Sequence, residues 1–272
     1  MTSNQDQDDG AYDEQLDQAW EALEDGDPEE ALALAASVPS HIGERSLLEG
    51  RAYLDLCMAN AAAGALARAT DARGAEDHDV RALDAELRLL SWDLAGARKV
   101  LDQLADEAFD VDWWERRALL ADLAGEHHRA EVLLVEARRE APELVERPVR
   151  VTDEVFDQVV EEALASLPEA FQRAVSVARI VREPMPWVEL AGPEPLAVPP
   201  DVLGLFVGPT LHELAEERSG ELPPVIYLFK RNIERASSDR EELFNEIRIT
   251  LFHEIGHLLG LDEDEVAAMG LE

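Results

Sequence analysis

Small residues recur every thirty-three positions through the first half of the chain, and this recurrence limits what that half can fold into. One column holds Ala19, Ala52, Ala85 and Ala118, and another holds Ala31, Gly64, Ala97 and Ala130. Candidate turns lie between them at Gly26-Asp27, Ala59-Asn60, Trp92-Asp93 and Gly125-Glu126. A helix, a short turn and a second helix, repeated four times, explain these columns, because two helices approach closely where their side chains are small.

The turns carry Asp27, Asn60 and Asp93, which we expect to cap the second helix of each pair. The last unit, WWERRALLADLAGEHHRAEVLLVEARREAPE, has its glycine, alanines and proline at the offsets of tetratricopeptide (TPR) repeats, which it resembles. That resemblance implies a superhelical array whose concave face holds a protein partner. The alternative is an irregular alanine-rich helical bundle, because the first three units match less well.

The charge balance excludes some partners. The 272 residues include 60 acidic and 24 basic ones, for a net charge of −36. Such a field repels nucleic-acid phosphates and anionic lipid, so we expect neither nucleic acid nor a membrane as partner.

The single cysteine, Cys57, cannot form an intrachain disulfide, and we expect it to be a small buried residue. The N-terminal residues do not have the pattern of a secretory signal, and we therefore expect a cytoplasmic protein.

We predict three segments: a disordered acidic tail over residues 1–12, a TPR-like helical domain over 13–147 and a smaller domain over 148–272. The smaller domain begins with a helix that Thr152 caps and continues with strands over 174–183, 202–207 and 225–229. It closes with a helix from Ser238, whose capping box includes Glu241, to a C-cap at Gly260. The whole chain is therefore expected to be α+β, an all-α array followed by a small α/β domain.

The closing helix contains His253-Glu254-Ile255-Gly256-His257. Residues four apart lie on one face of a helix, so both imidazoles can reach one metal ion. In zinc hydrolases with this spacing the glutamate acts as a base on water. The alternative is a surface helix with two incidental histidines.

Zinc requires a third protein ligand, and few residues follow His257. Gly260 permits a left-handed turn, after which Asp262, Glu263, Asp264 and Glu265 are the candidates. Glu263 is favoured over Asp262 because it lies six residues after His257, the spacing of extended motifs of this type. These acids also suit the first turn of a short last helix, where the helix dipole favours negative charge.

Three segments together, LGLFVGPTL, LPPVIYLFKRNIE and EIRITLFHEIGHLLGLDEDEVAAMGL, resemble the minimal zincin family over roughly residues 150 to 272. The resemblance implies a compact zincin-like fold with a few strands beside an active-site helix. It also implies that His253, His257 and Glu263 bind Zn²⁺ and that Glu254 is the catalytic base. The family usually carries aspartate where this chain has Glu263.

The predicted function is a zinc metallopeptidase whose TPR-like array recruits a protein or peptide substrate, or a partner. Two alternatives remain. One is an interaction scaffold in which the zincin-like domain is structural or weakly active, and the other is a zinc hydrolase acting on a non-peptide amide.

Overall fold

The computed structural model describes residues 12–272, except for residues 40, 108–109, 146, 193–195, 216–222, 263–264 and 266–272. The predicted tail over 1–12 therefore lies, apart from Tyr12, outside the described residues. The chain is α+β and divides into two compact units. Unit 1 comprises Met1–Leu120 and Trp187–Pro200, and unit 2 comprises Ala121–Pro186 and Asp201–Glu272.

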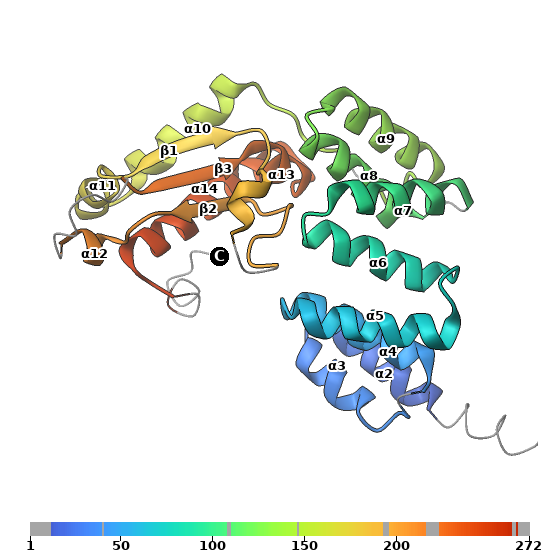
Figure 1. Cartoon of the computed structure of the whole chain (residues 1–272). Coiled ribbons are helices and arrows are strands. Elements are labelled where there is room, and N and C mark those ends of the chain that lie inside the picture. Colours follow the sequence, from blue (N-terminus) through green and yellow to red (C-terminus); the bar gives the residue numbers. More distant parts are fainter. Residues whose placement is uncertain are drawn as a thin grey trace, which may run out of the picture. The chain divides into compact units, whose positions relative to one another are not determined.

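Unit 1 is built from helical hairpins that follow one another along the chain (Figure 1). Successive helices α2 and α3, α4 and α5, and α6 and α7 pack as pairs. The helices are α2 (Asp13–Glu24), α3 (Pro28–Ala35), α4 (Gly43–Asp55), α5 (Ala59–Arg73), α6 (His78–Leu90), α7 (Leu94–Glu107) and α8 (Val111–Leu123), whose last three residues belong to unit 2.

The first alanine column lies where the repeat predicts close packing. Ala19, Ala52, Ala85 and Ala118 sit on α2, α4, α6 and α8 and are fully buried. In the second column the three alanines are fully buried, whereas Gly64 is partly exposed. The helix-turn-helix repetition is therefore present, and the resemblance to TPR repeats remains a prediction.

The turns within the pairs share a backbone conformation. A residue with positive φ occupies each of them, at Gly26, Cys57, Trp92 and Gly125. The predicted second turn is wrong by two residues: it lies at Cys57-Met58, and α5 starts at Ala59 without a side-chain cap. Asn60 therefore does not cap α5.

The other two predicted caps form. Asp27 accepts a hydrogen bond from the Glu30 amide at 2.9 Å, and Asp93 accepts one from the Gly96 amide at 3.0 Å. Cys57 is exposed rather than buried, because its turn places it at the surface.

Unit 2 combines helices with a three-stranded sheet (Figure 1). Strand β3 (Val225–Phe229) is central, with β1 (Arg179–Glu183) parallel to it on one side and β2 (Gly204–Val207) antiparallel on the other. The helices are α9 (His127–Glu140), α10 (Asp153–Ser166), α11 (Glu169–Val175), α12 (Leu211–Ala215), α13 (Lys230–Arg235) and α14 (Arg240–Leu259).

One face of the sheet packs against α10 and α14. Its core joins Phe156 and Val159 of α10 to Ile226 and Leu228 of β3 and to the apolar residues of α14. The strand predicted over 174–183 is too long, because residues 169–175 form α11 and only 179–183 pair with β3. The strand at 225–229 is confirmed, as is the cap of α10 by Thr152, which accepts from the Val155 amide.

The division into units differs from the boundary predicted between residues 147 and 148. Helix α9 belongs to unit 2, where the fully buried Asp122 carboxylate accepts hydrogen bonds from Arg231 and Arg235 of α13, each at 2.6 Å. Glu131 of α9 pairs with Arg150 and Arg231 at 2.8 Å. Although burial opposes the shift, these two arginines hold the pKa of Glu131 below its usual value.

Residues 187–200 belong to unit 1, although they lie between strands of unit 2 in the sequence. Leu196 is buried in a cluster with Leu47 and Leu83, and the Trp92 indole N–H donates to the Val198 carbonyl at 2.8 Å. The short helix η1 (Val188–Ala191) lies in this segment. Proline and charge patterns could not reveal this return, because the contacts join residues more than a hundred positions apart.

Within the described part of the chain, no helix is both long enough and apolar enough to cross a membrane.

The positive φ at Cys57 generates a stability prediction. A residue with a Cβ atom destabilises the folded state by about 1–2 kcal/mol in this conformation, and glycine avoids that strain. Glycine also gives the unfolded chain more conformational freedom, which offsets about 0.4–1 kcal/mol of the stabilisation. We expect Cys57→Gly to raise the free energy of unfolding by roughly 0.5–1 kcal/mol, measured by urea denaturation. Cys57→Ala is the matched control and should show no such gain; equal stability of the two variants would contradict the account.

Candidate zinc centre

The helix that carries the motif, α14, has a defined start and end. Asp239, rather than the predicted Ser238, is its N-cap and accepts from the amides of Glu241 and Glu242 at 2.7 and 2.9 Å. Ser238 instead donates its amide to the Glu242 carboxylate at 2.7 Å, so Glu242, rather than the predicted Glu241, is the acid that reaches back beyond the start of the helix. Gly260 ends the helix in the left-handed region with φ of 86°, as predicted.

Helical periodicity then divides the motif between two sides of α14. Ile247, Leu251, Ile255 and Leu258 are buried in the core of unit 2. The two histidines are only partly buried and line a cleft.

His253 and His257 bring their outer ring nitrogens together. Their Nε2 atoms are 3.1 Å apart, and the rings meet edge to face with centroids 4.7 Å apart. Two nitrogens bound to one tetrahedral zinc, with bonds of about 2.0–2.1 Å, lie about 3.3–3.4 Å apart. The observed separation is close to that value.

The other nitrogen of His257 fixes its tautomer. Nδ1 lies 3.3 Å from the Leu261 carbonyl oxygen, which can only accept a hydrogen bond. A neutral ring that donates Nδ1–H to this carbonyl has its Nε2 lone pair on the side of His253. A carbonyl behind a ligating imidazole is the usual arrangement that orients such a ring.

Glu254 lies on the side of α14 that faces β2, and only 6% of its surface is exposed. Its side chain fits there because Gly204 of β2 has no side chain. A Cβ atom on Gly204 would lie 2.9 Å from both Cγ and Oε1 of Glu254 and 2.7 Å from Cγ2 of Thr250. The first residue of β2 therefore sets the space available to the carboxylate.

The cleft has a volume of about 470 Å³ and lies between β2, α14 and the chain that follows α14. Gly204, Leu205 and Phe206 contribute one wall. His253, Glu254 and His257 all line it, so the structure brings together the three motif residues that the sequence predicted.

Of the acidic residues that follow Gly260, the structure describes Asp262 and Glu265 but not Glu263 and Asp264. Asp262 lines the cleft, and its carboxylate accepts from the Glu265 amide at 2.9 Å, while its own amide donates to the Glu265 carboxylate at 3.1 Å. This reciprocal pair is a capping box. Glu263 lies outside the described residues, so the predicted third ligand has no described position.

The donors that are described suit zinc: two imidazoles on one helix, with their Nε2 atoms 3.1 Å apart. Among the described residues, which exclude Glu263, no group of three or more histidine, cysteine or acidic side chains is placed to hold a metal ion.

Two contacts of the site were not predicted from the residues. Gly204 lies in the LGLF segment, but the sequence of one strand does not indicate which residue of another element it faces. The Leu261 carbonyl is a main-chain group, and its position depends on the turn at Gly260.

Comparison with known proteins supports the same region. A family model described as zincin-like metallopeptidase matches residues 178–271, which contain β1, β2, β3 and α14. The match leaves out the helices from α2 to α11. No curated protein matches the chain. The C-terminal part is thus similar to zincin-like metallopeptidases.

The contact between Gly204 and Glu254 predicts the effect of one methyl group. Gly204→Ala should lower the free energy of unfolding by about 1–3 kcal/mol, because Thr250 and Glu254 must shift to admit it. Gly64→Ala is the control: the nearest atom lies 3.7 Å from the added carbon, so the same change in helix α5 should stabilise slightly. Urea denaturation measures both, and an unaffected Gly204→Ala protein would disprove the close approach.

Proposed function

We propose that this chain is a zinc-dependent peptidase that hydrolyses peptide bonds in the cleft beside α14. The observation that carries the proposal is the convergence of the His253 and His257 Nε2 atoms, 3.1 Å apart, next to the buried Glu254 in a cleft lined by β2. The family match over residues 178–271 supports the same chemistry.

His253 and His257 would hold the ion, with the tautomer of His257 set by the Leu261 carbonyl. Zinc bound there would supply a Lewis acid that lowers the pKa of water to about 7 and polarises a carbonyl. Glu254 takes the proton from the attacking water and passes it to the departing amine. Its shielded position against Gly204 keeps its carboxylate in one orientation for both transfers.

Strand β2 supports an extended substrate. In the described sheet β2 is the outer strand beside β3, and its residues line the cleft that contains the histidines. The main-chain groups of an outer strand can pair with an added strand, which is a common way to bind an extended peptide. A peptide bound along β2 would pass the reacting groups of α14, and the apolar Leu205 and Phe206 would favour apolar neighbours of the cleaved bond.

The helical unit has a separate role in this proposal, the recruitment of a protein substrate or partner. It also favours a second candidate, an interaction protein whose zincin-like part is structural or weakly active. The observation behind that candidate is a large groove among the first helices of the hairpins.

The proposal predicts different results for ligand and base variants. His253→Ala and His257→Ala should lose the single bound zinc, measured by inductively coupled plasma mass spectrometry. Glu254→Gln should keep the zinc and lose at least about 10²-fold of peptide turnover, the usual size of a general-base contribution. Turnover is measured with a peptide library read by mass spectrometry.

His128→Ala is the control for the histidine variants, because this exposed residue of α9 does not line the cleft. Wild-type protein that binds no zinc would refute the proposal. Zinc-loaded wild-type protein that cleaves no peptide while Glu254→Gln changes nothing would favour the interaction protein.

The third ligand is tested by a pair of neighbouring variants. Because the Asp262 carboxylate already accepts from the Glu265 amide, we propose Glu263 as the third ligand. Glu263→Gln should weaken zinc binding by more than the roughly 10–100-fold that loss of an outer partner costs. Asp262→Asn should leave the zinc dissociation constant within a few-fold of wild type, as measured by competition with a chromogenic chelator. The reverse pattern would assign the ligand to Asp262.

A further inference from the structure

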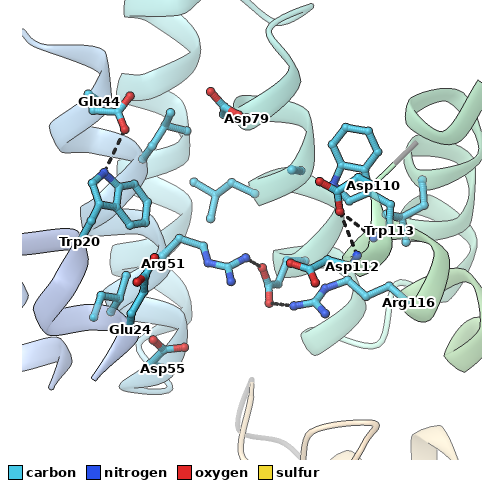
Figure 2. Close-up of a pocket in the computed structure, with 16 residues that line it drawn as sticks. Trp20, Glu24, Glu44, Arg51, Asp55, Asp79, Asp110, Asp112, Trp113 and Arg116 are labelled. Atoms are coloured by element: carbon cyan, nitrogen blue, oxygen red, sulfur yellow. Dashed lines mark hydrogen bonds and ion pairs between the residues drawn. The ribbon is translucent and has the colours of Figure 1, made fainter. Parts of the chain in front are cut away.

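Unit 1 contains a groove that the zinc chemistry does not use. It has a volume of about 540 Å³ and is lined mainly by the first helix of each hairpin, α2, α4, α6 and α8 (Figure 2). We call it the first-helix groove. Seven of its lining residues are acidic and two are arginines, so the formal charge of its lining is 2 − 7 = −5.

Two indoles contribute to the walls, Trp20 from α2 and Trp113 from α8 (Figure 2). Both are half-buried. The Trp20 ring is fixed because its N–H donates to the Glu44 carboxylate at 2.9 Å. Leu47 and Leu83 are buried and also line the groove. The walls therefore combine aromatic and aliphatic surface with the acidic groups.

The middle of the groove already holds guanidinium groups. Arg51 of α4 and Arg116 of α8 both donate to Glu86 of α6, one to each carboxylate oxygen (Figure 2). Glu86 is thereby neutralised by the protein itself. Glu44 and Asp79 are paired as well, with Arg73, which does not line the groove.

Three of these acidic groups have no such internal partner. Within the described part of the chain, the carboxylates of Glu24, Asp55 and Asp112 make no hydrogen bond or ion pair. Partial burial raises the pKa of Asp55, Arg51 opposes the shift, and the Glu86 carboxylate adds to it. A carboxylate in this state gains from a bound cation.

We propose that the first-helix groove binds an arginine-containing basic segment of a partner protein. A guanidinium fits both kinds of wall, because it stacks on an indole and donates two parallel hydrogen bonds to a carboxylate. The aliphatic stem of arginine can cover the leucines that line the groove. The acidic groups lie on three different helices, so one extended segment with several arginines can reach them together.

The charge of the chain supports this choice of partner. A net charge of −36 steers a basic segment toward the protein and repels nucleic acid. The inference deepens the recruiting role proposed above and does not depend on the zinc chemistry, because binding to the groove is measured directly.

The test uses the full-length chain carrying Glu254→Gln, so that a probe peptide is not cut. Fluorescein-labelled hexa-arginine is titrated at 0.15 M salt, the roughly physiological strength at which distant charges are screened, and anisotropy is read. Glu24→Gln, Asp55→Asn and Asp112→Asn together should weaken binding on the order of ten-fold, since each partly exposed ion pair contributes modestly. Trp113→Leu should also weaken it, and hexa-lysine should bind less tightly than hexa-arginine.

The matched control removes the same charge elsewhere in unit 1. Glu29→Gln, Asp71→Asn and Glu76→Gln change exposed residues that do not line the groove, and binding should stay within about two-fold. The melting temperatures of both triple variants are measured as well, so that a loss of binding is distinguished from a loss of folding. Equal weakening by the two triple variants, equal binding of hexa-lysine, or no binding of hexa-arginine would overturn the proposal.

Discussion

The burial of one side of α14 is the interaction on which unit 2 depends. Leu243, Ile247, Leu251, Ile255 and Leu258 are each at most 2% exposed, and each contributes about 1.5–3 kcal/mol by leaving water. They pack against α10 and β3 in one core. Because this packing fixes the rotation of the helix, it also decides which residues face the cleft.

The site follows from that rotation. Two histidines one turn apart converge on the open side, while Glu254, one position after His253, points toward β2. A helix so placed could not hold the carboxylate if β2 began with a larger residue, since Gly204 supplies the space. The geometry of the candidate zinc centre is therefore shared between a helix and a neighbouring strand.

Arginine is the other organising element of the chain. Arg231 and Arg235 secure the buried Asp122 in unit 2, and Arg51 and Arg116 secure Glu86 in unit 1. With 60 acidic residues and 24 basic ones, these pairs leave a large surplus of negative charge. Part of this excess negative charge lies in the first-helix groove, where acidic side chains line the same walls as apolar ones.

Short-range patterns in the sequence determined much of this protein. Alanine spacing predicted the buried positions of the hairpins, the apolar run at 225–229 predicted β3, and the spacing of His253 and His257 predicted their convergence. Each of these depends on helix or strand periodicity, which acts within a few residues. The same range explains the cap at Asp27 and the helix end at Gly260.

Only the tertiary structure decided the rest, because the contacts involved join distant residues. It assigned α9 to unit 2 through Asp122, returned residues 187–200 to unit 1 through Leu196, and set Gly204 against Glu254. Two further outcomes involve local contacts: the cap of α14 at Asp239 and the hydrogen bond from the Glu265 amide to the Asp262 carboxylate. These last two choices lay between neighbouring acids or hydroxyls of similar propensity, so local sequence could not separate them, whereas the path of the folded chain does.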